Sequence, residues 1–319
     1  MRFAALAFLL APILCAQDPT PVFHATSELV LVDVQVLNRK TGAPAPALRP
    51  GDFEVSEEGV RQEITHFSRD EFPLSVVLLF DLTDSVQGVL KHLAQGAQTA
   101  LAHFKPSDEV AVMVYSGHAS LVDGFTTDRA RTSHAIEKAA AMSSDEPAYF
   151  NEGIYRAAVQ LRQAGNPSNR RVIVWLTDNL PNVPYHPEHP VHSEAEAFRA
   201  LHEEGVVVAP ILLKDRAWAV PGLIVEAAEA SHRKDAPPGN ARTYAELSGG
   251  QAVGLRGKQP EERLAQLIDE LRARYTIGYR PSDPRAAGTF RRIEVKLAAS
   301  GGLRPKQWNV LARQGYYRQ

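Results

Sequence analysis

The feature that most constrains the fold is a series of short, continuous apolar runs separated by amphipathic stretches. The runs lie at residues 74–80, 110–115, 171–176 and 206–213. Runs of this kind are typical of strands that are buried on both faces of a parallel sheet. The stretches between them have apolar residues at helical spacing, and 86–104 is the longest of these. This alternation predicts an α/β fold with a doubly wound, mostly parallel sheet.

The same pattern predicts the remaining elements of this α/β unit, which we place at residues 74–274. Residues 119–125 are expected to pair with the strand at 110–115 as the second arm of a hairpin. A short strand is expected near 252–255. Further helices are expected at 132–142, 152–164, 193–204, 241–247 and 261–274.

Two shorter segments with strand-like patterns flank the α/β unit. In residues 24–70, valines alternate with other residues between Val30 and Val36, and two more strands are expected at 52–56 and 62–67. In residues 275–319, strands are expected at 275–279 and 290–297. Neither segment is long enough to form a sheet that is stable by itself. We therefore predict that the two segments pack together as one β-sandwich-like unit, with the α/β unit inserted between them.

The first 16 residues have the layout of a secretory signal peptide. Arg2 provides a positive start, an apolar run extends from Phe3 to Leu14, and the small residue Ala16 marks the expected cleavage point. The apolar run is too short to span a bilayer. We expect an exported protein, periplasmic or secreted, with cleavage after Ala16 rather than lipid attachment at Cys15.

The charge balance argues against a nucleic-acid partner. The chain has 35 basic and 37 acidic residues, whereas nucleic-acid-binding proteins usually present a basic face. The pairs Arg170-Arg171 and Arg291-Arg292 are short, and we expect them at solvated strand edges. Beyond the signal peptide, no segment of the sequence is long and apolar enough to cross a membrane.

Side chains that carry oxygen follow the first and third buried strands. Asp81, Thr83 and Ser85 alternate after the first strand, and Asp178 follows the third. Doubly wound sheets bind their ligands beyond the carboxyl ends of the strands. A hard cation such as Mg²⁺ prefers an octahedral shell of oxygens. These residues therefore predict a site for Mg²⁺ or Mn²⁺, and the alternative is that they only cap the following helix.

The pattern Asp-x-Thr-x-Ser at 81–85 resembles the Asp-x-Ser-x-Ser signature of von Willebrand factor A domains. Leu176-Thr177-Asp178 resembles the third metal loop of that family, and the resemblance covers about residues 74–274. The flanking segments are similar to a group of exported bacterial proteins, abundant in acidobacteria, called VWFA-related. The flanking motifs are Thr26–Val34, Asp52–Val55, Tyr275–Tyr279 and Gly315–Tyr317.

The resemblance implies a metal-dependent adhesion site without catalysis. Thr83 and Ser85 would bind the metal directly through their hydroxyls. Asp81 and Asp178 would act through waters or as hydrogen-bond acceptors around the metal. One coordination position would remain for the acidic side chain of a partner protein.

One departure from the family pattern concerns a second loop, on which the family has a threonine. Here that position falls at Pro147 or Ala148, and neither side chain carries an oxygen. Asp145 or Glu146 could take the place of the threonine, and Asp84 could add a carboxylate from the first loop. Without such a substitute, the site would be weak or empty.

Three histidines, His186, His189 and His192, recur at a spacing of three. Imidazoles bind zinc and other transition metals. Prolines interrupt this stretch, however, so the histidines cannot line one face of a helix. We interpret the stretch as a solvated loop after Asp178 that shapes the specificity for a partner.

The sequence thus predicts an exported, non-catalytic binding protein that engages a protein partner through a divalent metal. It contains no nucleophile elbow, nucleotide-binding loop or complete metalloprotease motif, so we do not expect an enzyme. The alternative is an envelope scaffold protein with a degenerate, metal-free site.

Overall fold

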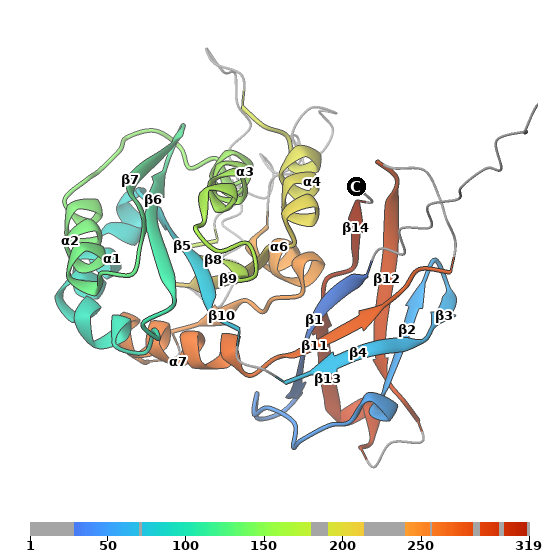
Figure 1. Ribbon diagram of the computed structural model, residues 1–319. Coiled ribbons are helices and arrows are strands. Elements are labelled where there is room, and N and C mark those ends of the chain that lie inside the picture. Colours follow the sequence, from blue (N-terminus) through green and yellow to red (C-terminus); the bar gives the residue numbers. More distant parts are fainter. Residues whose placement is uncertain are drawn as a thin grey trace, which may run out of the picture.

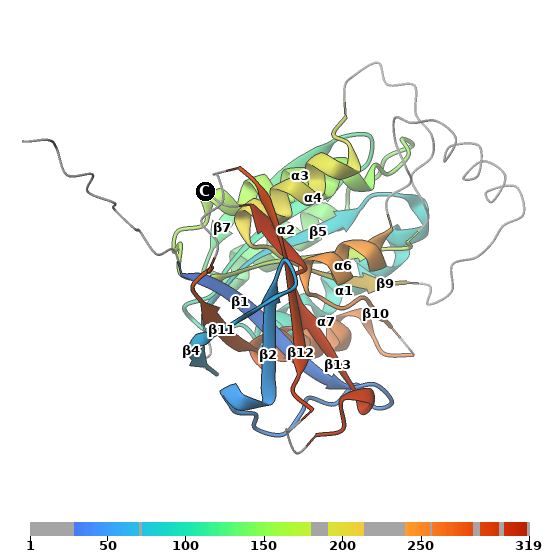
Figure 2. The same ribbon diagram turned by 90° about the vertical axis from the view of Figure 1, so that its right-hand side faces the viewer.

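An α/β unit and a smaller β unit lie side by side in the computed structural model (Figure 1). Figure 2, turned by 90°, places the β unit in front of the α/β unit. None of the described helices is both long and apolar enough to cross a membrane. The structure describes residues 29–69, 72–179, 191–213, 240–255, 257–282, 288–299 and 303–317.

The α/β unit is built on a six-stranded sheet with the order β10-β9-β8-β5-β6-β7. Five of these strands run parallel, and β7 pairs antiparallel with β6 at one edge. Every residue of the central strand β5 is buried, as expected for a strand covered on both faces. These features confirm the predicted fold class and the hairpin arm. The strands are β5 (Leu74–Asp81), β6 (Glu109–Tyr115), β7 (Ala119–Thr126), β8 (Arg170–Thr177), β9 (Val207–Leu212) and β10 (Val253–Gly254).

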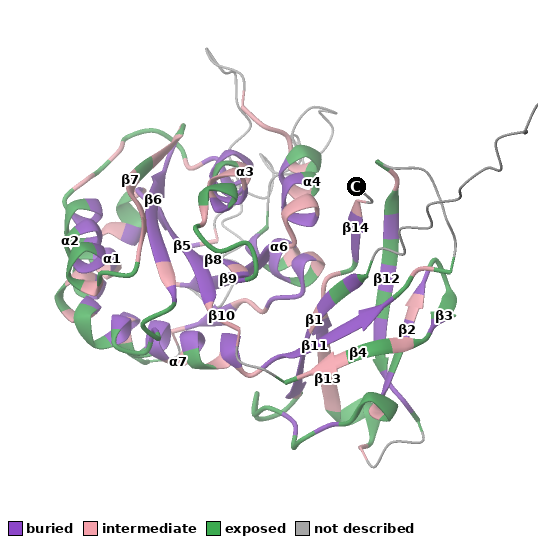
Figure 3. Cartoon of the chain, viewed as in Figure 1, coloured by how far each residue is buried: buried purple, intermediate pink, exposed green. Residues whose placement is uncertain are grey.

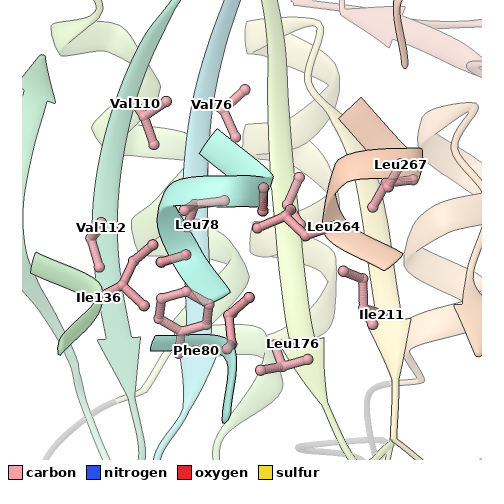
Figure 4. Packing of buried hydrophobic residues seen from close by; sticks show 14 of the residues in the cluster. Val76, Leu78, Phe80, Val110, Val112, Ile136, Leu176, Ile211, Leu264 and Leu267 are labelled. Atoms are coloured by element: carbon pink, nitrogen blue, oxygen red, sulfur yellow. The ribbon is translucent and has the colours of Figure 1, made fainter. Parts of the chain in front are cut away.

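Helices cover both faces of this sheet, and each turns its buried side toward the strands (Figure 3). On one face, Ile136, Leu264 and Leu267 of the helices belong to the same apolar cluster as Leu78 and Phe80 of β5 (Figure 4). The helices of this face are α1 (Asp84–Leu101), α2 (Arg129–Ala140) and α7 (Pro260–Arg272). Those of the other face are α3 (Phe150–Gln160), α4 (Glu194–Glu204) and α6 (Ala241–Ser248).

The β unit consists of two four-stranded sheets, ordered β13-β1-β11-β4 and β14-β12-β2-β3. Strands from the two ends of the described chain are neighbours in both sheets. β1 lies between β11 and β13, and β12 lies beside β2. Their inward side chains form a separate apolar core. The strands are β1 (Val30–Asn38), β2 (Phe53–Glu57), β3 (Val60–Gln62), β4 (Ile64–Ser68), β11 (Tyr275–Tyr279), β12 (Phe290–Leu297), β13 (Trp308–Ala312) and β14 (Gly315–Tyr317).

The β unit departs from the sequence prediction at two places. The segment expected as one strand at 62–67 is divided into β3 and β4, which belong to different sheets. β13 was not predicted, because four of its five residues are only partly buried and give little apolar alternation. Its place is set by backbone pairing with β1. Three short 3₁₀ turns complete the description, at Pro50–Asp52, Leu161–Gln163 and Pro305–Gln307.

The expectation that Arg170-Arg171 is solvated was wrong for Arg170, whose side chain is only 2% exposed. Its Nε and Nη2 donate to the two carboxylate oxygens of Asp33 in β1, at 2.9 and 3.2 Å. Its Nη1 donates to the carbonyl of Leu271 at 3.1 Å. Adjacent residues of a strand point to opposite faces, so one of two neighbouring arginines turns inward. Arg170 therefore joins the α/β unit to the β unit.

The same correction applies to Arg291-Arg292 on β12. Arg292 is exposed, but the side chain of Arg291 is 2% exposed and forms an ion pair with the fully buried Glu57. The hydroxyls of Tyr279 and Tyr316 donate to Glu57 Oε2 at 2.6 and 3.0 Å. A buried charge needs such partners, because leaving water without them costs several kcal/mol. This cluster therefore belongs to the core of the β unit.

Candidate metal-binding site at the carboxyl ends of β5 and β8

The structure brings Asp81, Thr83, Ser85 and Asp178 together at one edge of the central sheet. β5 and β8 are parallel neighbours in register, with Phe80 beside Leu176. Parallel strands place their carboxyl ends at the same edge of a sheet, so Asp81 and Asp178 become neighbours although they are far apart in the sequence. Asp81 is the last residue of β5, and Asp178 follows β8 directly.

The hydroxyls of this cluster are oriented by the carboxylates. Thr83 Oγ1 donates to Asp81 Oδ1 at 2.7 Å, and Ser85 Oγ donates to Asp178 Oδ2. The two hydroxyl oxygens lie 3.3 Å apart. Each hydroxyl has one proton, which is already given to a carboxylate, so the oxygens face each other with lone pairs. The free lone pairs of the two oxygens could coordinate a cation that lies between them.

The spacing of the two hydroxyl oxygens suits a small divalent cation. Mg–O bonds are about 2.1 Å long in an octahedral shell, so neighbouring oxygens lie about 3.0 Å apart. The distance of 3.3 Å between Thr83 Oγ1 and Ser85 Oγ is close to this value. Ser85 is exposed and Thr83 is partly exposed, so the same point is accessible from solvent. The residues therefore fit Mg²⁺ or Mn²⁺.

Asp81 is held in place by donors on both of its oxygens. The backbone N–H of Thr83 donates to Oδ1 at 2.9 Å. The hydroxyls of Tyr115 and Thr177 donate to Oδ2 at 3.0 and 3.3 Å. Tyr115 in turn accepts a hydrogen bond from Trp175 Nε1 at 2.8 Å. This arrangement fixes the carboxylate, which is 1% exposed, and with it the orientation of the Thr83 hydroxyl.

Burial also sets the protonation of this cluster. It raises the pKa of Asp81 to about 6, against the lowering effect of the hydrogen bonds from Thr83. The nearby charge of Asp178 raises this pKa as well. Burial, followed by the charge of Asp81, holds the pKa of Tyr115 well above its ordinary value. Tyr115 therefore remains a hydrogen-bond donor, and a cation at the site would offset the repulsion between the two carboxylates.

Helix capping alone does not account for these hydroxyls. Thr83 is the N-cap residue of α1, but its side chain accepts no hydrogen bond from the first turn of the helix. Asp128, Ser193 and Asn240 occupy the same position in α2, α4 and α6, and their side chains do accept from first-turn amides. The Thr83 hydroxyl is thus directed toward Asp81 instead of its own helix.

The second loop directs its carboxylates elsewhere. Glu146 Oε2 lies 3.6 Å from His118 Nδ1, on the turn between β6 and β7. Asp145 is exposed. Within the described part of the chain, neither residue makes a hydrogen bond to Asp81 or Thr83. Asp84 is exposed in the first turn of α1, beside the cluster.

Sequence reasoning missed the roles of Tyr115 and Glu152. Tyr115 ends a predicted strand at the edge where ligands bind, and that position was a usable signal. Gly153 permits its close packing with α3, because a Cβ there would lie 2.8 Å from Tyr115 Cγ. Glu152 accepts from Arg156 Nε at 2.7 Å and from the backbone N–H of His192 at 3.0 Å. The sequence gave no signal for the second contact, which joins segments 40 positions apart.

The contact with Glu152 also places His192, the one described member of the predicted histidine loop. Its Nδ1 lies 2.6 Å from Glu152 Oε2, and its ring stacks on Tyr155 at 3.5 Å. Burial raises the pKa of Glu152, but the hydrogen bonds from Arg156 and His192 outweigh it and the pKa is lowered. His186 and His189 lie outside the described residues.

Among the described residues, no group of three or more His, Cys, Asp or Glu side chains gathers around a point where a metal could bind. The candidate site instead combines two carboxylates with two hydroxyls. This donor set consists of oxygens only, which suits Mg²⁺ or Mn²⁺ better than a transition metal that prefers imidazole or thiolate.

The fold and the site define a class: a doubly wound α/β domain with an oxygen-rich cluster beyond its central strands. Residues 76–180 match the family model described as von Willebrand factor type A domain. This range includes all four side chains of the cluster. The α/β unit is therefore a von Willebrand factor type A-related domain, which confirms the family resemblance of this part of the sequence.

Solved structures with similar folds include BatB from Bacteroides thetaiotaomicron, with 16% identity, a TM-score of 0.41, and coverage of 62% of this chain and 97% of that chain. A von Willebrand factor type A protein from Catenulispora acidiphila has 12% identity and a TM-score of 0.43, covering 92% and 75%. Proximal thread matrix protein 1 from the mussel byssus, with a zinc-occupied MIDAS motif, has 13% identity and a TM-score of 0.42, covering 67% and 49%. No curated protein matches the chain.

Proposed function

We propose that this chain is an exported, non-catalytic binding protein that engages an acidic group of a protein partner through Mg²⁺ or Mn²⁺. The observation that carries this proposal is the orientation of the Thr83 and Ser85 hydroxyls. Their protons are given to Asp81 and Asp178, and their oxygens face each other 3.3 Å apart. This arrangement supplies two neutral ligands for a cation and two carboxylates that fix those ligands.

The chemistry of this donor set explains the preference for an acidic partner. The two oxygens that would bind the cation directly are uncharged, so the cation keeps most of its positive charge. Mg²⁺ usually retains several waters in its shell, and a carboxylate from a partner can replace one of them. The exposure of Ser85 and Asp84 leaves the cation side of the cluster open to such a partner. Export is supported by the sequence of residues 1–16.

The proposal is tested by calorimetric titration of the exported form with Mg²⁺ and with Mn²⁺, in wild type, Ser85→Ala and Ser193→Ala. Ser193→Ala is the matched control, because it removes a hydroxyl that caps α4 rather than one in the cluster. It should cost about 1 kcal/mol of stability and leave metal binding unchanged. Ser85→Ala should weaken metal binding by about tenfold or more. A wild type that binds neither metal at millimolar concentration would refute the proposal.

One observation favours a second candidate, an envelope scaffold protein with a metal-free site. The second loop has Pro147 and Ala148 where a hydroxyl would complete the metal shell, and Glu146 lies beside His118 instead. For a scaffold of this kind, wild type and Ser85→Ala would be indistinguishable in both metal titrations. Thermal unfolding in chelator and in excess Mg²⁺ would also give the same midpoint.

A further inference from the structure

A cavity of about 190 Å³ lies between the α/β unit and the β unit, at the amino end of β8. It is distant in the fold from the candidate metal site, which lies at the carboxyl end of the same strand. The charged residues on its wall come from both units, and they are Asp33, Arg170, Arg171, Glu204 and Arg313.

The two carboxylates on this wall are already paired. Asp33 accepts hydrogen bonds from Arg170 at 2.9 and 3.2 Å. Glu204 pairs with Arg171 and with Arg162, each at 2.6 Å. Both acids of the wall therefore have other arginines as their direct ion-pair partners, although the charge of Asp33 also raises the pKa of the third arginine of the wall.

Arg313 is that third arginine. Its Nη2 donates to the carbonyl of Leu31 at 2.7 Å, and its guanidinium lies 5.6 Å from the centre of the Tyr316 ring. Arg313 is partly exposed as a residue, but its Nε is buried without a hydrogen-bond partner. Burial lowers the pKa of Arg313, and the charge of Asp33 acts in the opposite direction. Across the described ranges, no carboxylate forms an ion pair with it. A guanidinium that is partly removed from water and has no direct ion pair would stabilise an anionic ligand that reaches it.

The rest of the wall limits the kind of anion. Leu31, Phe72 and Val207 line the cavity with apolar side chains. Asp33 and Glu204 lie on the same wall and would repel a doubly charged anion such as phosphate. Ligand pockets commonly combine an apolar lining with a few polar groups that fix orientation. We propose that the cavity binds a small monocarboxylate, with its charged group on Arg313 and a short apolar body against Leu31, Phe72 and Val207.

Such a ligand would contact both units at once. Leu31 and Arg313 belong to the β unit, Val207 belongs to β9 of the α/β unit, and Phe72 lies on the connection from β4 to β5. Binding would therefore stabilise the docked arrangement of the two units as well as each fold.

The test is calorimetry and thermal unfolding of the wild-type protein with benzoate as the probe and benzyl alcohol as its uncharged counterpart. We expect saturable benzoate binding with a rise in the unfolding midpoint. Benzyl alcohol should bind about tenfold more weakly or worse, because it lacks the charge-assisted hydrogen bond. Equal binding of the two compounds, or no benzoate binding to the folded protein, would overturn the proposal. So would tighter binding of inorganic phosphate than of benzoate.

Two variants locate the binding group. Arg313→Gln should abolish benzoate binding, and Arg61→Gln should preserve it with the same change in charge, since Arg61 is exposed on β3. Leu31→Glu keeps the proposal testable if Arg313→Gln fails to fold. Leu31 is 46% exposed and tolerates a polar side chain, and the new carboxylate would pair with Arg313 and displace benzoate. Benzoate binding that survives in either folded variant would contradict the assignment.

Discussion

The two ends of β8 carry polar clusters of opposite charge. At the carboxyl end, Asp81 and Asp178 receive hydrogen bonds from neutral hydroxyls, so the four side chains together carry two negative charges. At the amino end, three arginines share a wall with two carboxylates, and Arg313 is left in excess. Both clusters are rich in hydrogen bonds, but the carboxyl-end cluster lacks a cation and the amino-end cluster lacks an anion. Both ligand proposals rest on this surplus of charge rather than on the number of polar groups.

The largest expected loss of stability comes from a substitution that breaks the cluster at the amino end of β8. Arg170→Ala leaves the carboxylate of Asp33 without its direct ion pair. Loss of one partner of a buried pair typically costs about 3–5 kcal/mol of stability, and the 25% exposure of Asp33 places this variant at the lower end of that range. Urea denaturation would measure it. Arg162→Ala is the control, because that arginine is 48% exposed and its pair with Glu204 should contribute less than about 1 kcal/mol. Equal losses in the two variants would show that burial of the pair does not matter.

The next effect is a pH dependence of stability that comes from His202, which lies on α4 where the α/β unit meets the β unit. Burial, followed by the charge of Arg313, lowers the pKa of His202 to about 4 from its ordinary value near 6.5. Between these values the unfolded chain binds a proton that the folded protein does not. The free energy of unfolding should therefore fall as the pH drops from about 6.5 to about 4, by at most about 3 kcal/mol.

Denaturation of wild type and His202→Gln across this pH range measures that contribution as a difference. The variant should show the smaller decline, because glutamine does not titrate. Parallel curves for the two proteins would mean that other groups cause the acid sensitivity and that His202 is not desolvated by its contacts with Phe290 and Gly315.

A third substitution, Tyr115→Phe, tests the cluster at the carboxyl end of β8. Tyr115→Phe removes the donor to Asp81 Oδ2 and the acceptor of Trp175 Nε1, and it should cost about 1–3 kcal/mol of stability. If the cluster binds a metal, loss of the Tyr115 hydroxyl should also weaken metal binding by about tenfold, because this hydroxyl holds Asp81, which in turn orients Thr83. Calorimetry would separate the two effects, and an unchanged metal affinity would assign Tyr115 a purely structural role.

The smallest expected effect concerns the second loop. Glu146→Ala removes a carboxylate that is 60% exposed and pairs with His118, so stability should change little. Metal affinity should not change either, because Glu146 lies on the loop between α2 and α3 and is directed toward His118, on the turn between β6 and β7. A tenfold loss of affinity in the calorimetric titration would show instead that this carboxylate swings to the metal and replaces the missing threonine.

The fold class was predictable because each buried strand is an uninterrupted apolar run, and this signal is local. The position of the candidate site was predictable for a related reason, since a strand end is visible in the sequence. The convergence of Asp81 and Asp178 follows from that rule together with the pairing of β5 and β8. The metal-binding role of these residues stays a prediction.

The features that were missed depend on which segments become neighbours. Arg170 and Arg291 are ordinary arginines in the sequence, and only the pairing of distant strands gives them Asp33 and Glu57. The contact between Glu152 of α3 and His192 of the histidine loop could not be predicted, because no regular spacing in the sequence relates these two residues. β13 was overlooked for the same reason, since its partner β1 comes from the other end of the described chain.

The chain leaves the β unit after β4 and re-enters it at β11, and these two strands are hydrogen-bonded neighbours with Ser68 opposite Thr276. A pulling force applied before β1 and after β14 would therefore pass through the two sheets of the β unit. As long as β4 and β11 stay paired, they act as a bridge that bypasses the α/β unit. The candidate metal site would bear no mechanical load until the β unit itself opened.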